Sequence, residues 1–213
     1  MELDHLVIAT HDLEKAKTRF SEATDIRPAD GGSHPGLGTR NALISFGDRQ
    51  YLEILVPDPG QTLPEATTLS FPPEGQEQIF HWAIRSSDLP GVAARASAAG
   101  LEPTRIFSAS RAQPGEGTLE WDLLGIGGHD LAGMVPFFID WKDTPHPSEK
   151  APYVGPLESL SLGLPPSHPL RAFLDPAPAG VRIVEGEPEI EVHFTSPRGT
   201  IRMAERRPAG FPF

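Results

Sequence analysis

Apolar and polar positions follow the same pattern in two stretches of the chain, LDHLVIATHDL at residues 3–13 and IFHWAIRSSDL at residues 79–89. Each stretch is a short apolar run with a histidine near its start, His5 or His81, and an Asp-Leu pair follows each histidine seven residues later. Successive side chains of a strand point to opposite faces, and both faces of these runs are apolar. The pattern therefore predicts two buried strands, each beginning one of two related modules.

A helix and a hairpin are expected after the first of these strands. Asp12 is a good N-cap, and apolar residues recur at spacings of three and four over residues 12–23, which predicts an amphipathic helix. A Gly/Pro-rich loop is expected at residues 31–38. The alternating runs 40–46 and 51–57, joined by the turn GDRQ, then predict a hairpin.

The second strand begins the same order of elements. Asp88 is the expected cap of a helix over residues 89–100, and the strands expected after it are 103–110, 118–126 and 135–142. A third, degenerate copy is expected near the C-terminus, with a strand at 157–164, a short helix at 167–174 and a meander over 181–205. Ser159 stands in this copy where the other two have a histidine.

These repeats predict an α+β protein built from tandem βαβββ modules. The expected division is a domain over residues 1–142 made of modules 1–60 and 78–142, a Pro-rich linker at 143–156, a third βαβββ-like module at 157–204 and a tail at 205–213. The third module could cover an edge of the sheet, lengthen the wall of the cleft or mediate a homodimer. We favour a structural role for it.

Composition narrows the classes of partner. The formal charge is −11, from 18 Lys and Arg against 29 Asp and Glu, which argues against nucleic acid and anionic membranes because either would need a basic face. No apolar run approaches the roughly 20 residues of a membrane span, and no leader-like pattern is present, so a cytoplasmic protein is expected. The chain has no cysteine, so any metal would have to sit on nitrogen and oxygen ligands.

The matched histidines are candidate metal ligands. Equivalent positions of two paired modules meet at a shared interface, so His5 and His81 could face each other across a cleft. Glu53 and Asp140 lie among apolar residues in the last strand of each module, and a carboxylate buried there without a partner would be costly. The alternatives are core histidines with one backbone partner, and carboxylates in salt bridges or at the surface.

The repeated strand–helix–strands unit, the Asp-Leu helix starts, HPGLGTRNALISFG with YLEIL, and PFFIDW resemble the vicinal oxygen chelate superfamily, in its glyoxalase-like branch. The resemblance covers residues 3–142 closely and 157–204 loosely. It implies a cupped mixed sheet around a central cleft, and a divalent ion (Fe, Mn, Ni, Co or Zn) held by His5, Glu53, His81 and Asp140. The superfamily usually has a glutamate at the position of Asp140, so the side chain of Asp140 is shorter by one methylene group.

Other polar residues are candidates for contact with a substrate. Thr39, Arg40 and Asn41 follow a glycine-rich loop and could orient a polar substrate, with His34 as a catalytic acid or base. Trp121 could line the cavity. The alternative is a hairpin loop whose glycines serve its turns.

The resemblance implies several functions. The first is a metal-dependent isomerase or lyase acting on a small substrate with vicinal oxygens, in which the ion stabilises an enolate and Glu53 or Asp140 moves a proton. With two histidines and one carboxylate bound, an Fe(II) extradiol-type dioxygenase is the alternative. A third is a metal-free drug-binding protein of the bleomycin-resistance type, and a fourth is a scaffold that keeps the histidines as remnants.

Overall fold

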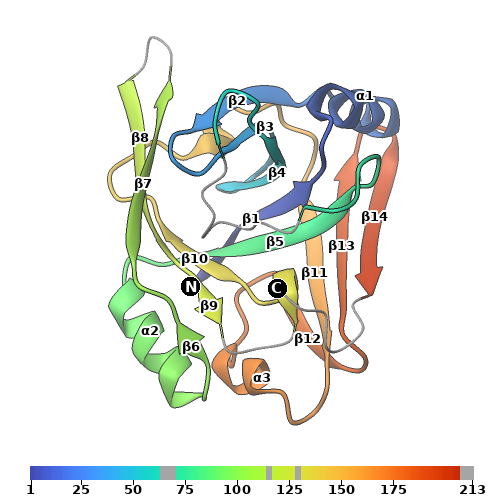
Figure 1. Cartoon of the computed structure of the whole chain (residues 1–213). Coiled ribbons are helices and arrows are strands. Elements are labelled where there is room, and N and C mark those ends of the chain that lie inside the picture. Colours follow the sequence, from blue (N-terminus) through green and yellow to red (C-terminus); the bar gives the residue numbers. More distant parts are fainter. Residues whose placement is uncertain (63–70, 114–116, 128–130, 207–213) are drawn as a thin grey trace.

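In the computed structural model, the described residues are 1–62, 71–113, 117–127 and 131–206. Two βαβββ units form one mixed sheet of eight strands, in the order β2-β3-β4-β1-β5-β10-β8-β7 (Figure 1). The first unit consists of β1 (Glu2–Ala9), α1 (Leu13–Thr24), β2 (Ala29–His34), β3 (Thr39–Gly47) and β4 (Gln50–Pro57). The second consists of β5 (Gln78–Arg85), α2 (Leu89–Ala98), β7 (Phe107–Gln113), β8 (Gly117–Leu124) and β10 (Phe137–Asp140).

The two units are paired in the same way. In each, the first strand runs parallel to the last strand, β1 beside β4 and β5 beside β10. The first strands of the two units meet as the antiparallel pair β1–β5 at the centre of the sheet. The predicted α+β class with tandem modules and a cupped mixed sheet is therefore confirmed.

Both predicted helix caps are present. The side chain of Asp12 accepts a hydrogen bond from the backbone N–H of Lys15 at 3.0 Å, and that of Asp88 accepts one from Gly91 at 2.9 Å. Each satisfies one of the backbone donors that a helix leaves unpaired at its start. The seven-residue spacing from histidine to aspartate therefore connects each central strand to its helix.

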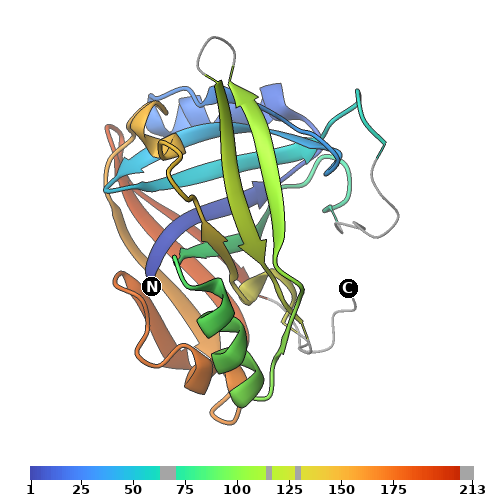
Figure 2. The same ribbon diagram turned by 90° about the vertical axis from the view of Figure 1, so that its left-hand side faces the viewer.

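The first half of one predicted loop is a strand. The expected Gly/Pro-rich loop at 31–38 overlaps at residues 31–34 with the edge strand β2, which pairs antiparallel with β3, and residues 35–38 form the turn between them. The alternation of apolar residues that marks a strand is absent there because β2 is an edge strand of polar and glycine residues. The sheet curves so far that β2 comes close to the other edge strand, β7, and the β7–β8 hairpin crosses in front of β3 and β4 in Figure 2.

A second sheet has four strands, in the order β12-β11-β13-β14. Its elements are β11 (Leu157–Leu164), α3 (Pro169–Phe173), β12 (Val181–Glu185), β13 (Glu189–Ser196) and β14 (Gly199–Arg206). The order of elements matches the predicted third copy, but β11 pairs with β12 and β13, whereas the first strand of each other unit pairs with the last. The final strand also runs two residues past the predicted boundary at 204, and residues 207–213 of the expected tail lie outside the described residues.

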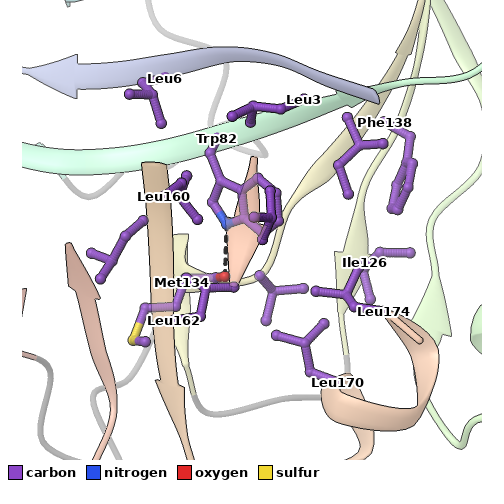
Figure 3. Close-up of a cluster of buried hydrophobic side chains, with 14 of the residues drawn as sticks. Leu3, Leu6, Trp82, Ile126, Met134, Phe138, Leu160, Leu162, Leu170 and Leu174 are labelled. Carbon is purple, nitrogen blue, oxygen red and sulfur yellow. Dashed lines mark hydrogen bonds between the residues drawn. The ribbon is translucent and has the colours of Figure 1, made fainter. Parts of the chain in front are cut away.

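The second sheet packs against the outer face of the main sheet (Figure 1). Trp82 of β5 is fully buried there among leucines of both sheets, including Leu6 and Leu160 (Figure 3). Its indole N–H donates to the carbonyl oxygen of Met134 at 2.8 Å, so its one polar atom is satisfied. Each large apolar side chain buried in this way contributes about 1.5–3 kcal/mol relative to an exposed position.

The remaining elements are short. They are β6 (Glu102–Pro103) paired with β9 (Ile126–Gly127), and the 3-10 turns Ala132–Met134 and Pro147–Glu149, the second of which lies in the predicted linker. Among the described residues, no helix is both long and apolar enough to cross a membrane.

Candidate active site

The inner face of the main sheet surrounds a cavity of about 1090 Å³. Its wall includes side chains from β1, β3, β4, β5, β7, β8 and β10, and most of them are apolar or aromatic. Polar side chains also line the cavity, and those that matter for chemistry are His5, His34, Thr39, Asn41, Glu53, His81 and Arg111. The cavity therefore combines a large apolar surface with a small set of convergent polar groups, as ligand sites generally do.

His5 is held by a buried carboxylate. Its Nδ1 lies 2.6 Å from Oδ1 of Asp4, and Asp4 also accepts hydrogen bonds from Trp141, Arg85 and His146 at 3.1 Å each. Burial would raise the pKa of Asp4, but the hydrogen bonds from His146 and His5 outweigh it, and the pKa lies well below its usual value. An ionised carboxylate only accepts hydrogen bonds. Neutral His5 must therefore carry its proton on Nδ1, which leaves Nε2 as an acceptor.

Glu53 faces the acceptor nitrogen of His5. Its Oε2 lies 3.8 Å from Nε2 of His5, which is too long for a hydrogen bond and leaves both atoms available to a bound molecule. Its other oxygen, Oε1, accepts a hydrogen bond from Nδ2 of Asn41 at 2.7 Å. Glu53 is paired in register with Val7, two residues after His5 in β1, which places both side chains on the inner face.

Asn41 connects Glu53 to two more polar residues. Its Oδ1 accepts from Nη1 of Arg111 at 2.9 Å, so its amide nitrogen must be the group that faces Glu53 and Nε2 of His34, the latter at 3.1 Å. Because Asn41 donates to Nε2 of His34, that nitrogen is unprotonated and the proton lies on Nδ1, which donates to Thr39 at 2.9 Å. Burial lowers the pKa of His34, although Glu53 opposes the shift, and the imidazole stays neutral.

Two glycines of β2 make room for this network. A Cβ on Gly31 would lie 2.1 Å from Oδ1 of Asn41 and 2.4 Å from Nη1 of Arg111, so the side chains of Asn41 and Arg111 would have to shift. A Cβ on Gly32, which has a φ of +137°, would lie 3.3 Å from Cδ of Arg111. Gly31 and Gly32 therefore allow Arg111 to reach across from β7 to Asn41, where the two edges of the sheet approach each other.

Most residues proposed from the sequence line this cavity. They are His5, His34, Thr39, Asn41, Glu53, His81 and Trp121, and the ring of Trp121 meets His34 edge-on with centroids 6.2 Å apart. Arg40 is exposed, because it alternates with Thr39 and Asn41 in β3. Asp140 does not line the cavity: Phe137 and Ile139 occupy the inner face of β10, and the carboxylate of Asp140 accepts from the backbone N–H of Lys142 at 2.9 Å.

Comparison with known proteins supports a family assignment. Residues 3–176 match the model of the family described as "Glyoxalase-like domain". A hypothetical protein from Staphylococcus aureus has a similar structure, with a TM-score of 0.63 at 17% identity over 98% of this chain and 88% of that one. Methylmalonyl-CoA epimerase from Mycobacterium tuberculosis gives 0.43 at 19% identity, over 68% of this chain and 89% of the epimerase. No curated protein sequence matches the chain.

This chain belongs to the glyoxalase-like domain family. The family lies in the vicinal oxygen chelate superfamily, as the resemblance of the sequence implied. The likeness to the staphylococcal structure extends over nearly the whole chain and shows a shared fold.

The donor set of this glyoxalase-like domain does not fit the expected four-ligand metal site. Glu53 lies opposite Val7, two residues after His5, and the equivalent residue in the second module lies opposite Ala83, two residues after His81. That residue is Phe137, whose ring is edge-on to both His5 and His81, with centroids 5.3 and 5.9 Å apart. Within the described part of the chain, no three His, Asp or Glu side chains are grouped so that they could hold a metal ion.

Proposed function

We propose that this glyoxalase-like protein is an enzyme that moves a proton on a small molecule with adjacent oxygen atoms. His5 is the base and Glu53 is its partner across the reacting atoms. The observation that carries the proposal is the buried Asp4–His5 pair, which fixes the tautomer of His5 and directs its free Nε2 toward Oε2 of Glu53. A histidine held by a buried carboxylate in this way is an orientated general base.

The proposed step is proton abstraction from a carbon next to a carbonyl group. His5 Nε2 takes the proton, and the electron pair of the broken C–H bond forms the enolate. The imidazolium that results lies between two carboxylates, Asp4 on Nδ1 and Glu53 near Nε2, and both stabilise its charge. Return of the proton to the former carbonyl carbon, or to an oxygen of the enolate, completes an isomerisation.

Burial in an apolar cavity strengthens these interactions, because charges attract one another more strongly where water is excluded. His34, which was expected to act as an acid or base, is assigned a positioning role because Thr39 and Asn41 occupy both of its ring nitrogens. Asp140 has no role in the proposal. No step is assigned to a metal ion, because Phe137 stands where the fourth ligand would be.

Hydrogen–deuterium exchange tests the proposal without knowledge of the natural substrate. The protein is incubated in D₂O with a panel of 2-oxo acids, 2-hydroxyketones and 2-oxoaldehydes, and the loss of the carbon-bound proton signal is followed by ¹H NMR. We expect exchange above the rate without protein for at least one compound, falling about 100-fold or more in His5→Gln and in Glu53→Gln. The control is His11→Gln, an exposed histidine outside the cavity.

Exchange that persists unchanged in His5→Gln would refute the assignment of the base. If compounds bind but none exchanges, the second candidate applies, a metal-free small-molecule binding protein. The size and apolar character of the cavity favour that candidate, since about 1090 Å³ is slightly more than the roughly 1,000 Å³ at the top of the usual range for ligand sites and leaves room for a drug-sized molecule.

A further inference from the structure

We infer that the cavity takes an organic monocarboxylate with a large apolar body, and that Arg111 binds its carboxylate. The inference rests on the proposed function, because it names the substrate class of the same cavity. Arg111 was not among the candidates from the sequence, and the proposed proton transfer does not use it.

Arg111 is a buried cation with unused donors. Its side chain is 5% exposed, and among the described residues its one hydrogen-bond acceptor is Oδ1 of Asn41, which Nη1 contacts at 2.9 Å. Nε of Arg111 is buried and has no hydrogen-bond partner in the described part of the chain. A guanidinium carries five N–H donors, so most of its hydrogen-bonding capacity is unmet by these residues.

This arrangement is costly in the absence of a ligand. Arg111 makes no ion pair with any described carboxylate, and burial lowers the pKa of its guanidinium, although the neighbouring charge of Glu53 opposes the shift. Arginine nevertheless remains charged at neutral pH. A buried charge without a close counter-ion is unfavourable, and a ligand carboxylate would relieve that cost with charge-assisted, bidentate hydrogen bonds.

The surroundings of Arg111 indicate a single negative charge. Of the described residues that line the cavity, Arg111 is the sole lysine or arginine. Glu53 contributes a negative charge in the same cavity, bound to the other end of the Asn41 amide. One guanidinium matches the charge and geometry of one carboxylate, whereas a phosphate dianion would bring two negative charges.

The rest of the cavity indicates the body of the ligand. Leu119 and Trp121 of β8 lie beside Arg111 on the inner face, and Leu119 pairs in register with it. Further aromatic rings, Phe80, Phe107 and Trp141, line the same space. A chain or ring system of apolar atoms can therefore be buried while its carboxylate reaches Arg111.

Binding of matched compounds tests the inference. Calorimetric titration at neutral pH compares 4-phenylbutanoate, 4-phenylbutan-1-ol and 4-phenylbutyl phosphate on the wild-type protein. We expect the carboxylate to bind at least about tenfold more tightly than the alcohol. In Arg111→Gln this preference should disappear while the alcohol binds as before, and Arg111→Lys should keep part of it. Arg40→Gln, an exposed arginine on β3, is the matched control and should behave as the wild type.

Titration of the wild-type protein is enough to overturn the inference. It would be overturned if the acid and the alcohol bind with equal affinity, if neither binds, or if the phosphate binds more tightly than the carboxylate. Retention of the full preference in a folded Arg111→Gln would also overturn it. Failure of the proposed proton transfer can be distinguished from failure of this inference, because His5→Gln should lose proton exchange while keeping the preference for the carboxylate. Exchange that is absent in the wild-type protein, with the preference intact, would refute the proton transfer and leave this inference standing.

Discussion

Asp4 and His5 are consecutive residues of β1, yet their side chains are hydrogen-bonded to each other, Oδ1 to Nδ1 at 2.6 Å. Neighbours in a regular strand point to opposite faces and cannot do this. The pairing of β1 with β5 is irregular between Leu3 and His5, so that Asp4 lies at a bulge. Bulges redirect side chains and are common next to active sites, and this one allows Asp4 to turn toward the ring of His5.

Replacing Asp4 by asparagine should impair both activity and stability. An amide cannot balance the charge of the His5 imidazolium, so we expect proton exchange to slow by about 100-fold or more. Removing the carboxylate also leaves the guanidinium of Arg85 without this buried partner, which should lower the free energy of unfolding by about 3 kcal/mol. Urea unfolding measures the second effect. An Asp4→Asn protein with unchanged exchange would show that Asp4 does not act through His5.

The stability of the protein should fall as the pH drops below about 6.5. Burial lowers the pKa of both His34 and His146 below the usual value of about 6.5. Between the folded and unfolded pKa values the unfolded chain binds more protons than the folded one, so acid favours unfolding. The stabilisation is fully present above about pH 6.5 and declines below it.

Denaturant titrations at pH 7.5, 6.5 and 5.5 measure this dependence. His34→Gln removes one of the two imidazoles whose pKa is lowered and should give a shallower decline over the same range. A free energy of unfolding that is equal at pH 7.5 and 5.5 would contradict the lowered pKa values.

The sequence predicted the first strands and their caps, and it proposed seven residues that line the cavity, because these depend on local pattern. His5 and His81 stand out by their matched positions in the two repeats, and Glu53 stands out as a carboxylate within a short apolar run. Asp4 was missed because regular alternation puts it on the face opposite to His5, and a bulge is not visible in the sequence. Arg111 was missed because the predicted strand ended at residue 110, whereas β7 continues to Gln113.

The role expected of Asp140 depended on a register that the sequence does not contain. The repeat aligns the first strands of the two modules through their histidines, but the last strands differ in length and composition. Only the pairing of β10 with β5 shows that Phe137 is the counterpart of Glu53. The topology of the third copy was hidden for the same reason, since strand order depends on long-range pairing.

A single methyl group at Gly31 should disrupt the contact between the two edges of the sheet. The added Cβ would overlap Oδ1 of Asn41 and Nη1 of Arg111, so Gly31→Ala should lower the free energy of unfolding by about 1–3 kcal/mol. Gly186→Ala is the control, because a Cβ there meets nothing within 4 Å. Equal stability of the two variants would show that the packing of Arg111 against β2 is looser than described.

Introducing a carboxylate at position 137 should create a metal site. His5, Glu53 and His81 already face the cavity, and Phe137→Glu would add the missing donor of the second module. Without metal the new carboxylate lies among aromatic rings, and an unpaired buried charge is costly, so the thermal midpoint should fall. Added Zn²⁺ or Ni²⁺ should restore it, with about one ion retained per chain after desalting.

Phe137→Gln is the matched control, since an amide of the same shape is a poor ligand for these ions. The double variant Phe137→Glu, His5→Gln should lose the retained ion, because it removes a donor from the first module. For the wild-type protein we expect that chelator treatment changes neither the thermal midpoint nor the proton-exchange rate. A wild-type protein that keeps a stoichiometric ion through desalting and loses its exchange activity on chelation would show instead that His5, Glu53 and His81 hold a metal without a fourth protein ligand.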